Sequence, residues 1–148
     1  MSTPVSLVRL RQAQDYQFDV EFSADLPTLR VDEPPPLGQG QGPTPVQLLA
    51  AAVGNCLSDS LLFALRKSRQ QPEPIETEVS AETGRNAEGR IRVLKIEATL
   101  RLGVPAASLE HLDRVLATFE AYCTVTQTVG ASVPIAVHVV DCNGVAVK

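Results

Sequence analysis

The stretch "TPVQLLAAAVGNCLSDSLLFALRKSR", residues 44–69 of 148, carries the pattern of one long helix. Thr44 is a suitable N-cap and Pro45 suits the first helical position. Arginine and lysine residues occupy the last turn, where they interact favourably with the negative end of the helix dipole. A helix of this length runs about 38 Å, beyond the core of a small domain, so we expect another protomer to cover part of it. Apolar residues recur at steps of three and four, namely Leu48, Leu49, Ala52, Val53, Cys56, Leu57, Leu61, Ala64 and Leu65.

Polar residues interrupt the apolar window within this helix, which predicts a buried helix of a soluble protein rather than a membrane span. Strand patterns flank it on both sides. The alternation in "YQFDVEF", residues 16–22, and in "IETEVSAET", residues 75–83, is typical of half-buried strands. The sequence therefore predicts one α+β domain. Its expected parts are an N-terminal β meander (1–32), a Pro/Gly loop (33–45), the central helix (44–69), a β hairpin (75–102), helices (106–129) and C-terminal strands (133–147).

Composition excludes several classes of function. The net charge is −4 and no Lys/Arg run occurs, which argues against a nucleic-acid or anionic-membrane partner. Three cysteines and two histidines are scattered along the chain, so we expect no metal site, and no phosphate-binding motif predicts a cofactor. The N-terminus lacks an apolar signal region, so we expect a reducing, cytoplasmic location in which thiols stay free.

Two cysteines are the candidate reactive groups. Cys56 follows Gly54, which costs about 1 kcal/mol of helix stability relative to Ala, and such a cost suits a place where something approaches closely. The alternative is that Cys56 only fills a helix interface as a small apolar residue. Cys123, in "EAYCTVTQTV", lies at the start of a short helix, where the helix dipole would lower its pKa. Cys56 and Cys123 suggest a pair in which one thiol attacks a peroxide and the other resolves the product as a disulfide. Cys142 precedes an Asn-Gly turn, which is typical of a structural or exposed thiol.

Two stretches of the chain resemble the OsmC/Ohr family of osmotically induced and organic hydroperoxide resistance proteins. They are "VDEPPPLGQGQGPTPVQLLAAAVGNCLSDSLL", residues 31–62, and "FEAYCTVTQTVGASVPIAVHVVD", residues 119–141. The resemblance implies an OsmC-like fold, in which antiparallel sheets wrap around long central Cys-bearing helices in an intertwined homodimer with interfacial active sites. It also implies cofactor-free, thiol-dependent reduction of organic hydroperoxides and regeneration by a dithiol or lipoylated-protein reductant. By position, Cys56 would be peroxidatic and Cys123 resolving.

The chain departs from the family at two positions. Where the peroxidases carry a Glu just after the proline that opens the Cys helix, this chain has Val46 and Gln47. The family's thiolate-stabilising Arg, in the turn between the first two strands, is missing from "QAQD" here. Gln47 could still bond a peroxide oxygen, and Arg30 or Arg11 could replace the cation. Two hypotheses stay open: a thiol peroxidase, or a non-catalytic small-ligand-binding protein or thiol redox sensor of the OsmC-like branch.

Overall fold

The computed structural model describes residues 2–148. The chain forms two compact units, with the boundary between Leu48 and Leu49. The element order is three strands, a long helix, two strands, a helical segment and a last strand, which confirms the predicted α+β class. The expectation of a single domain stays a prediction.

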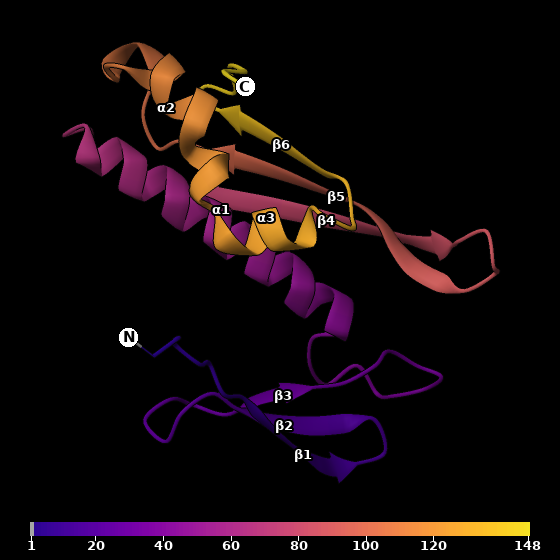
Figure 1. The fold of residues 1–148 in the computed structure, drawn as a ribbon. Coiled ribbons are helices and arrows are strands. Elements are labelled where there is room, and N and C mark those ends of the chain that lie inside the picture. Colours follow the sequence, from indigo (N-terminus) through magenta and orange to yellow (C-terminus); the bar gives the residue numbers. More distant parts are fainter. Residues whose placement is uncertain (1) are drawn as a thin grey trace. The chain divides into compact units, whose positions relative to one another are not determined.

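The first unit contains a three-stranded antiparallel sheet. Its strands are β1 (Arg9–Gln14), β2 (Gln17–Glu21) and β3 (Leu29–Val31), which pair in that order (Figure 1). The meander is thus confirmed, but the residues that are buried in it differ from those that the alternation of "YQFDVEF" predicts. Gln17 is buried and Tyr16 is exposed, because the Gln17 amide donates a 3.3 Å hydrogen bond to the carboxylate of Asp32.

The buried carboxylate of Asp32 organises the Pro/Gly loop that follows β3. It accepts hydrogen bonds from the backbone N–H groups of Glu33 (2.8 Å), Gln39 (3.1 Å) and Gln41 (3.0 Å). Burial by itself would raise the pKa of Asp32, but these donors and the Gln17 amide outweigh it and lower that pKa. A loop without regular structure is therefore held in one shape by a single side chain.

Helix α1 (Pro45–Lys67) begins in a reciprocal cap. The Gln47 N–H donates to Thr44 Oγ1 (3.2 Å), and the Thr44 N–H donates to Gln47 Oε1 (2.9 Å). The predicted N-cap is thus confirmed. From Leu49 onward α1 belongs to the second unit. Its buried residues are Ala50, Val53, Gly54, Leu57, Leu61 and Leu65.

The second unit contains a sheet in the order β4 (Glu76–Arg85), β5 (Ile91–Arg101), β6 (Ile135–Val140). The β4–β5 hairpin is antiparallel as predicted, whereas β6 pairs parallel to β5, so the sheet is mixed. The pairing is parallel because a helical segment carries the chain back to the end of the sheet at which β5 begins, so β6 runs in the same direction as β5. The C-terminal strands expected over 133–147 reduce to β6 and one isolated bridge between Val140 and Ala146.

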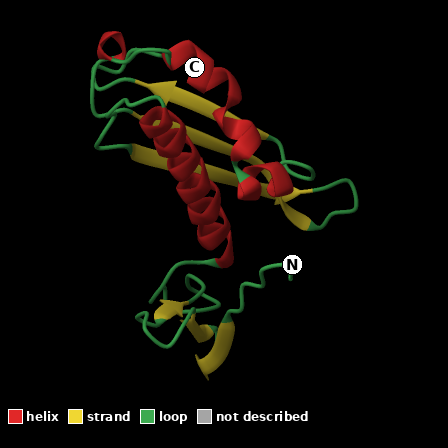
Figure 2. Ribbon diagram, turned by 60° about the vertical axis from the view of Figure 1, so that its left-hand side comes forward, coloured by secondary structure: helices red, strands yellow, loops and turns green. Residues whose placement is uncertain are grey.

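The helical segment between β5 and β6 is broken into short pieces. They are η1 (Ala106–Ser108), α2 (Leu112–Thr118), η2 (Phe119–Tyr122) and α3 (Thr124–Val129). The left-handed backbone of His111, with φ of 60°, separates η1 from α2. Figures 1 and 2 show α1 and this segment on the same face of the β4–β5–β6 sheet, so the core of the second unit lies between them.

Candidate functional site

Cys56 lies half-buried on α1, two residues after Gly54, at which strand β4 packs closely against the helix. A Cβ atom added at Gly54 would meet Val79 Cγ2 of β4 at 2.6 Å. One turn later, Ser58 Oγ donates to the Gly54 carbonyl (2.7 Å) and shares a 2.6 Å hydrogen bond with Thr77 Oγ1. The close approach expected near Cys56 is therefore made by strand β4 of the same chain, and it fixes the rotation of α1.

Cys123 lies fully buried between η2 and α3. Its Sγ–H donates a 2.9 Å hydrogen bond to the hydroxyl of Thr126, which is 6% exposed. The Cys56 thiol lies beside Cys123 and raises the pKa of Cys123. Both thiols are free and both belong to the same core cluster. The structure thus brings together the two cysteines that the sequence singles out.

The surroundings of Cys123 favour its neutral thiol. Burial raises the pKa of Cys123, and the neighbouring Cys56 thiol raises it further. The hydroxyl and backbone N–H of Thr126 oppose this increase without cancelling it. The expectation of a lowered pKa at a helix start is therefore wrong, because desolvation outweighs the contribution of a six-residue helix.

Arg30 and Gln47, the two residues predicted to orient substrate or thiolate, lie in the first unit and have partners there. The Arg30 Nε donates to Asp19 Oδ1 at 2.6 Å, and an Arg30 terminal nitrogen donates to Gln17 Oε1 at 3.0 Å. The hydrogen bond with Asp19 raises the pKa of Arg30. The carbonyl of Gln47 accepts the Thr44 N–H in the helix cap. The proposed roles of Arg30 and Gln47 in the chemistry stay predictions.

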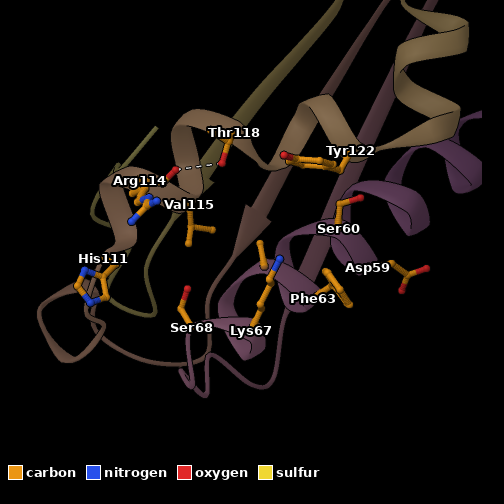
Figure 3. Close-up of a pocket in the computed structure, with 11 residues that line it drawn as sticks. Asp59, Ser60, Phe63, Lys67, Ser68, His111, Arg114, Val115, Thr118 and Tyr122 are labelled. Carbon is orange, nitrogen blue, oxygen red and sulfur yellow. Dashed lines mark hydrogen bonds between the residues drawn. The ribbon is translucent and has the colours of Figure 1, made fainter.

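A groove of about 700 Å³ runs between the second half of α1 and the α2–η2 segment. Figure 3 shows His111 and Arg114 toward one end of it, and Tyr122, Ser60 and Asp59 toward the other. Ser60 lies one turn after Cys56, and Tyr122 directly precedes Cys123. Each wall of the groove therefore has one end close in sequence to a cysteine, although neither Cys56 nor Cys123 lines the groove.

The groove combines aromatic and cationic side chains. Phe63 and Tyr122 are 70% and 79% exposed. Within residues 2–148, Lys67 and Arg114 form no ion pair, and the one acidic lining residue, Asp59, accepts a 3.1 Å hydrogen bond from the Asn55 amide. Over the same residues, no cluster of three His, Cys, Asp or Glu side chains could hold a metal ion. The groove suits an organic molecule with an apolar body.

Sequence reasoning missed Thr126 and the two exposed aromatics. A signal for Thr126 was available, because the third position of a helix faces the side chain of the residue that caps it, here Cys123. Phe63 lies outside the apolar stripe predicted for its helix, which indicates exposure, but nothing in the sequence pattern places Phe63 and Tyr122 on one groove. Only the structure shows that they line the groove.

Comparison with known proteins agrees with this architecture. The family model for OsmC-like protein matches residues 38–138. No curated protein matches the chain. A hypothetical protein from Aquifex aeolicus VF5 has a similar structure, with a TM-score of 0.75 and 18% identity over 94% of this chain and 97% of that one.

Two named proteins also share the fold. An organic hydroperoxide resistance protein OsmC from Legionella pneumophila gives a TM-score of 0.70 at 16% identity, over 94% of this chain and 98% of that one. The organic hydroperoxide resistance protein OhrB of Bacillus subtilis gives 0.70 at 14% identity, over 91% and 97%. With the family model covering most of its length and both cysteines, this chain belongs to the OsmC-like protein family.

Proposed function

We propose that this protein is a thiol-dependent peroxidase that reduces organic hydroperoxides. The Cys56 thiolate attacks the terminal oxygen of R–OOH, the O–O bond breaks, and the departing alkoxide takes a proton to become R–OH. Cys56 is left as a sulfenic acid. The Cys123 sulfur then attacks the Cys56 sulfur, forming a disulfide, and the Cys123 proton leaves with the hydroxyl as water.

The neighbouring positions of the two thiols are the observation that carries this proposal. Cys56 is partly exposed and Cys123 is fully buried beside it. This difference supports the assignment of Cys56 as the attacking thiol, since a hydroperoxide must first reach a sulfur. It also supports Cys123 as the resolving thiol, since a buried thiol next to a sulfenic acid competes well against external thiols.

The groove, which begins on α1 within one turn of Cys56, supports an organic rather than inorganic substrate. Its exposed Phe63 and Tyr122 can bury an apolar body, which hydrogen peroxide lacks. We propose a cytoplasmic homodimer whose disulfide is reduced by a dithiol or lipoylated-protein donor. The exposed apolar residues of α1 support a second copy as their cover.

The test is one equivalent of cumene hydroperoxide added to the reduced protein, with free thiols counted over time and disulfides mapped. We expect rapid loss of two thiols and a bond between Cys56 and Cys123. The Cys142→Ser variant is the matched control and should behave like the wild type. Unreacted Cys56 after hours, or unchanged turnover in Cys56→Ser, contradicts the proposal.

A second candidate function is a small-ligand-binding protein or thiol sensor without turnover. It is favoured by the engagement of the Arg30 guanidinium with Asp19 and Gln17, which leaves its cation already paired. In that case cumene hydroperoxide oxidises Cys56 slowly and stoichiometrically. A dithiol donor then sustains no turnover, whereas a peroxidase cycles under the same conditions.

A further inference from the structure

The resolving step requires a buried thiol to become a nucleophile. Cys123 must lose its proton as its sulfur attacks Cys56, yet it is fully removed from water. A thiolate forming in such a place needs a hydrogen-bond donor supplied by the protein. Any polar group that touches the Cys123 sulfur is therefore a candidate for assisting this step.

Thr126 supplies two such groups, its backbone N–H and its hydroxyl, and the hydroxyl is the one that a substitution can remove. It lies 2.9 Å from Cys123 Sγ and accepts the thiol hydrogen. Within residues 2–148 this hydroxyl makes no other hydrogen bond, so its own hydrogen is uncommitted. A hydroxyl can accept in one rotamer and donate in another, so it can turn its hydrogen toward the sulfur once the thiol proton has left.

Thr126 is also held in place for this exchange. Its carbonyl accepts the Gly130 N–H at 2.8 Å, and the Gln127 N–H donates to the Cys123 carbonyl at 2.9 Å. The flanking Val125 and Val129 pack against the core of the second unit. The β-branched side chain has few rotamers available in such surroundings, so the hydroxyl stays beside the sulfur.

We propose that Thr126 is a positioning residue for resolution: its hydroxyl accepts from the Cys123 thiol and then donates to the sulfur as that sulfur attacks Cys56. The step is Cys56–SOH plus Cys123–SH giving the disulfide and water, and Thr126 is unchanged at its end. The proposal rests on the proposed function for its biological setting. Its chemistry can be tested separately.

The separate test uses a mixed disulfide in place of a sulfenic acid. In a Cys142→Ser background, 5,5′-dithiobis(2-nitrobenzoate) modifies the half-exposed Cys56 and releases one thionitrobenzoate. Attack by Cys123 on the Cys56 sulfur then forms the Cys56–Cys123 disulfide and releases a second thionitrobenzoate. Both releases are followed by the yellow colour of this ion, the second as a separate, later phase. The rate of the second release reports on Cys123 alone, and adding Cys123→Ser should abolish it.

The matched variants are Thr126→Val, which keeps the shape and removes the hydroxyl, and Thr126→Ser, which keeps the hydroxyl. We expect the second release to slow roughly tenfold or more in Thr126→Val, the loss expected for a hydrogen bond to a charged group. Its pH profile should move to higher pH, and Thr126→Ser should restore rate and profile to near wild type. A wild-type rate in Thr126→Val, or a Ser variant as slow as the Val variant, overturns the proposal.

A parallel arm with cumene hydroperoxide separates the two proposals. If Cys56 is oxidised at the wild-type rate in Thr126→Val but the disulfide closes slowly, both proposals are supported. If hydroperoxide does not oxidise Cys56 in any variant while the second thionitrobenzoate release still depends on the Thr126 hydroxyl, the peroxidase proposal fails and the role of Thr126 stands.

Discussion

At the scale of single residues, Gly54 sets the position of the helix that carries Cys56. The space a side chain would occupy is filled by a methyl group of Val79 at 2.6 Å from the ideal Cβ position. The sequence indicates that Gly54 has a packing purpose, because the residue is costly in a helix. Which element approaches it depends on strand pairing far along the chain, which local pattern does not contain.

Gly54→Ala should destabilise the second unit despite the better helix propensity of alanine. The added methyl forces Val79 or α1 to move, an overpacking that costs about 1–3 kcal/mol of the free energy of unfolding. Urea unfolding measures this loss. In a Val79→Ala background the same substitution should cost much less. A Gly54→Ala protein as stable as wild type would contradict the packing described here.

Cys123 should react with iodoacetamide more slowly than Cys142, the exposed thiol of the same chain. Because burial raises the pKa of Cys123, its thiolate forms only at a pH above the ordinary thiol value of about 8.5. The alkylation rate of Cys123 should therefore keep rising as the pH passes that value. Mass spectrometry of the alkylated peptides gives both rates in one sample. A Cys123 rate that equals that of Cys142, or that stops rising below this pH, would show the described environment of Cys123 to be wrong.

At the scale of elements, the Asp32 loop shows how a segment without regular structure becomes ordered. The sequence predicts a Pro/Gly loop over 33–45, but its composition does not indicate that Asp32 orders this loop. An acidic residue before a loop full of unpaired N–H groups is a recognisable anchor in retrospect, since Asp commonly bonds the backbone of the residues that follow it.

Asp32→Asn should loosen this loop and remove its sensitivity to acid. The pKa of Asp32 is lowered in the fold, so the bonds of its carboxylate contribute at pH values above the unfolded pKa, about 3.9. They are lost as pH falls below that value and through the folded pKa. Amide-exchange protection at Gln39 and Gln41 should fall in this window in the wild type and be low at every pH in the variant.

Asp25→Asn, in an exposed turn, is the control for that substitution. It should leave the protection of both loop amides unchanged. Equal effects of the two substitutions would mean that the loop responds to net charge rather than to the Asp32 carboxylate.

The alternation in β4 and β5 predicts the hairpin, yet one inward position is wrong. The alternation of "RIRVLKIEATLRL", residues 90–102, predicts that Leu94 faces the core with Ile96 and Ala98, but Leu94 is 38% exposed. A register shift between Glu82 and Thr83 reverses the faces beyond it, so Val93 packs inward instead. A bulge of this kind depends on both paired strands at once, and the pattern of one strand cannot reveal it.

At the scale of the whole molecule, much of the apolar surface of α1 is left exposed in a single copy of the chain. Among the described residues it is the one helix long and apolar enough to cross a membrane, and only 28% of its most apolar window is buried. Its buried side packs on the sheet as a core helix does. The amphipathic pattern predicts which side faces that sheet, and the excess length predicts that something else covers the rest.

Ala52→Glu should weaken association between copies of the chain. Ala52 is exposed and lies one turn before Cys56 on α1, within the surface that we propose a second copy covers. Burying a carboxylate there without a partner disfavours the dimer. Light scattering after size-exclusion chromatography should show a dimer for the wild type and a shift to monomer for the variant.

Ala87→Glu, the same change in the exposed turn of the β4–β5 hairpin, is the matched control and should remain dimeric. A wild-type protein that is monomeric at all concentrations would rule out the homodimer and leave the exposed side of α1 for another partner.

The long connection that the parallel pairing of β5 and β6 requires has a consequence for thermal stability, because this connection carries Cys123. A bond from Cys123 to Cys56 would close a covalent ring of 68 residues that contains the β4–β5 hairpin. Restricting the unfolded chain in this way adds roughly 4 kcal/mol in the chain-entropy model. The oxidised protein should melt at a distinctly higher temperature than the reduced one, which would make thermal denaturation a direct gauge of how much of the protein has met its oxidant.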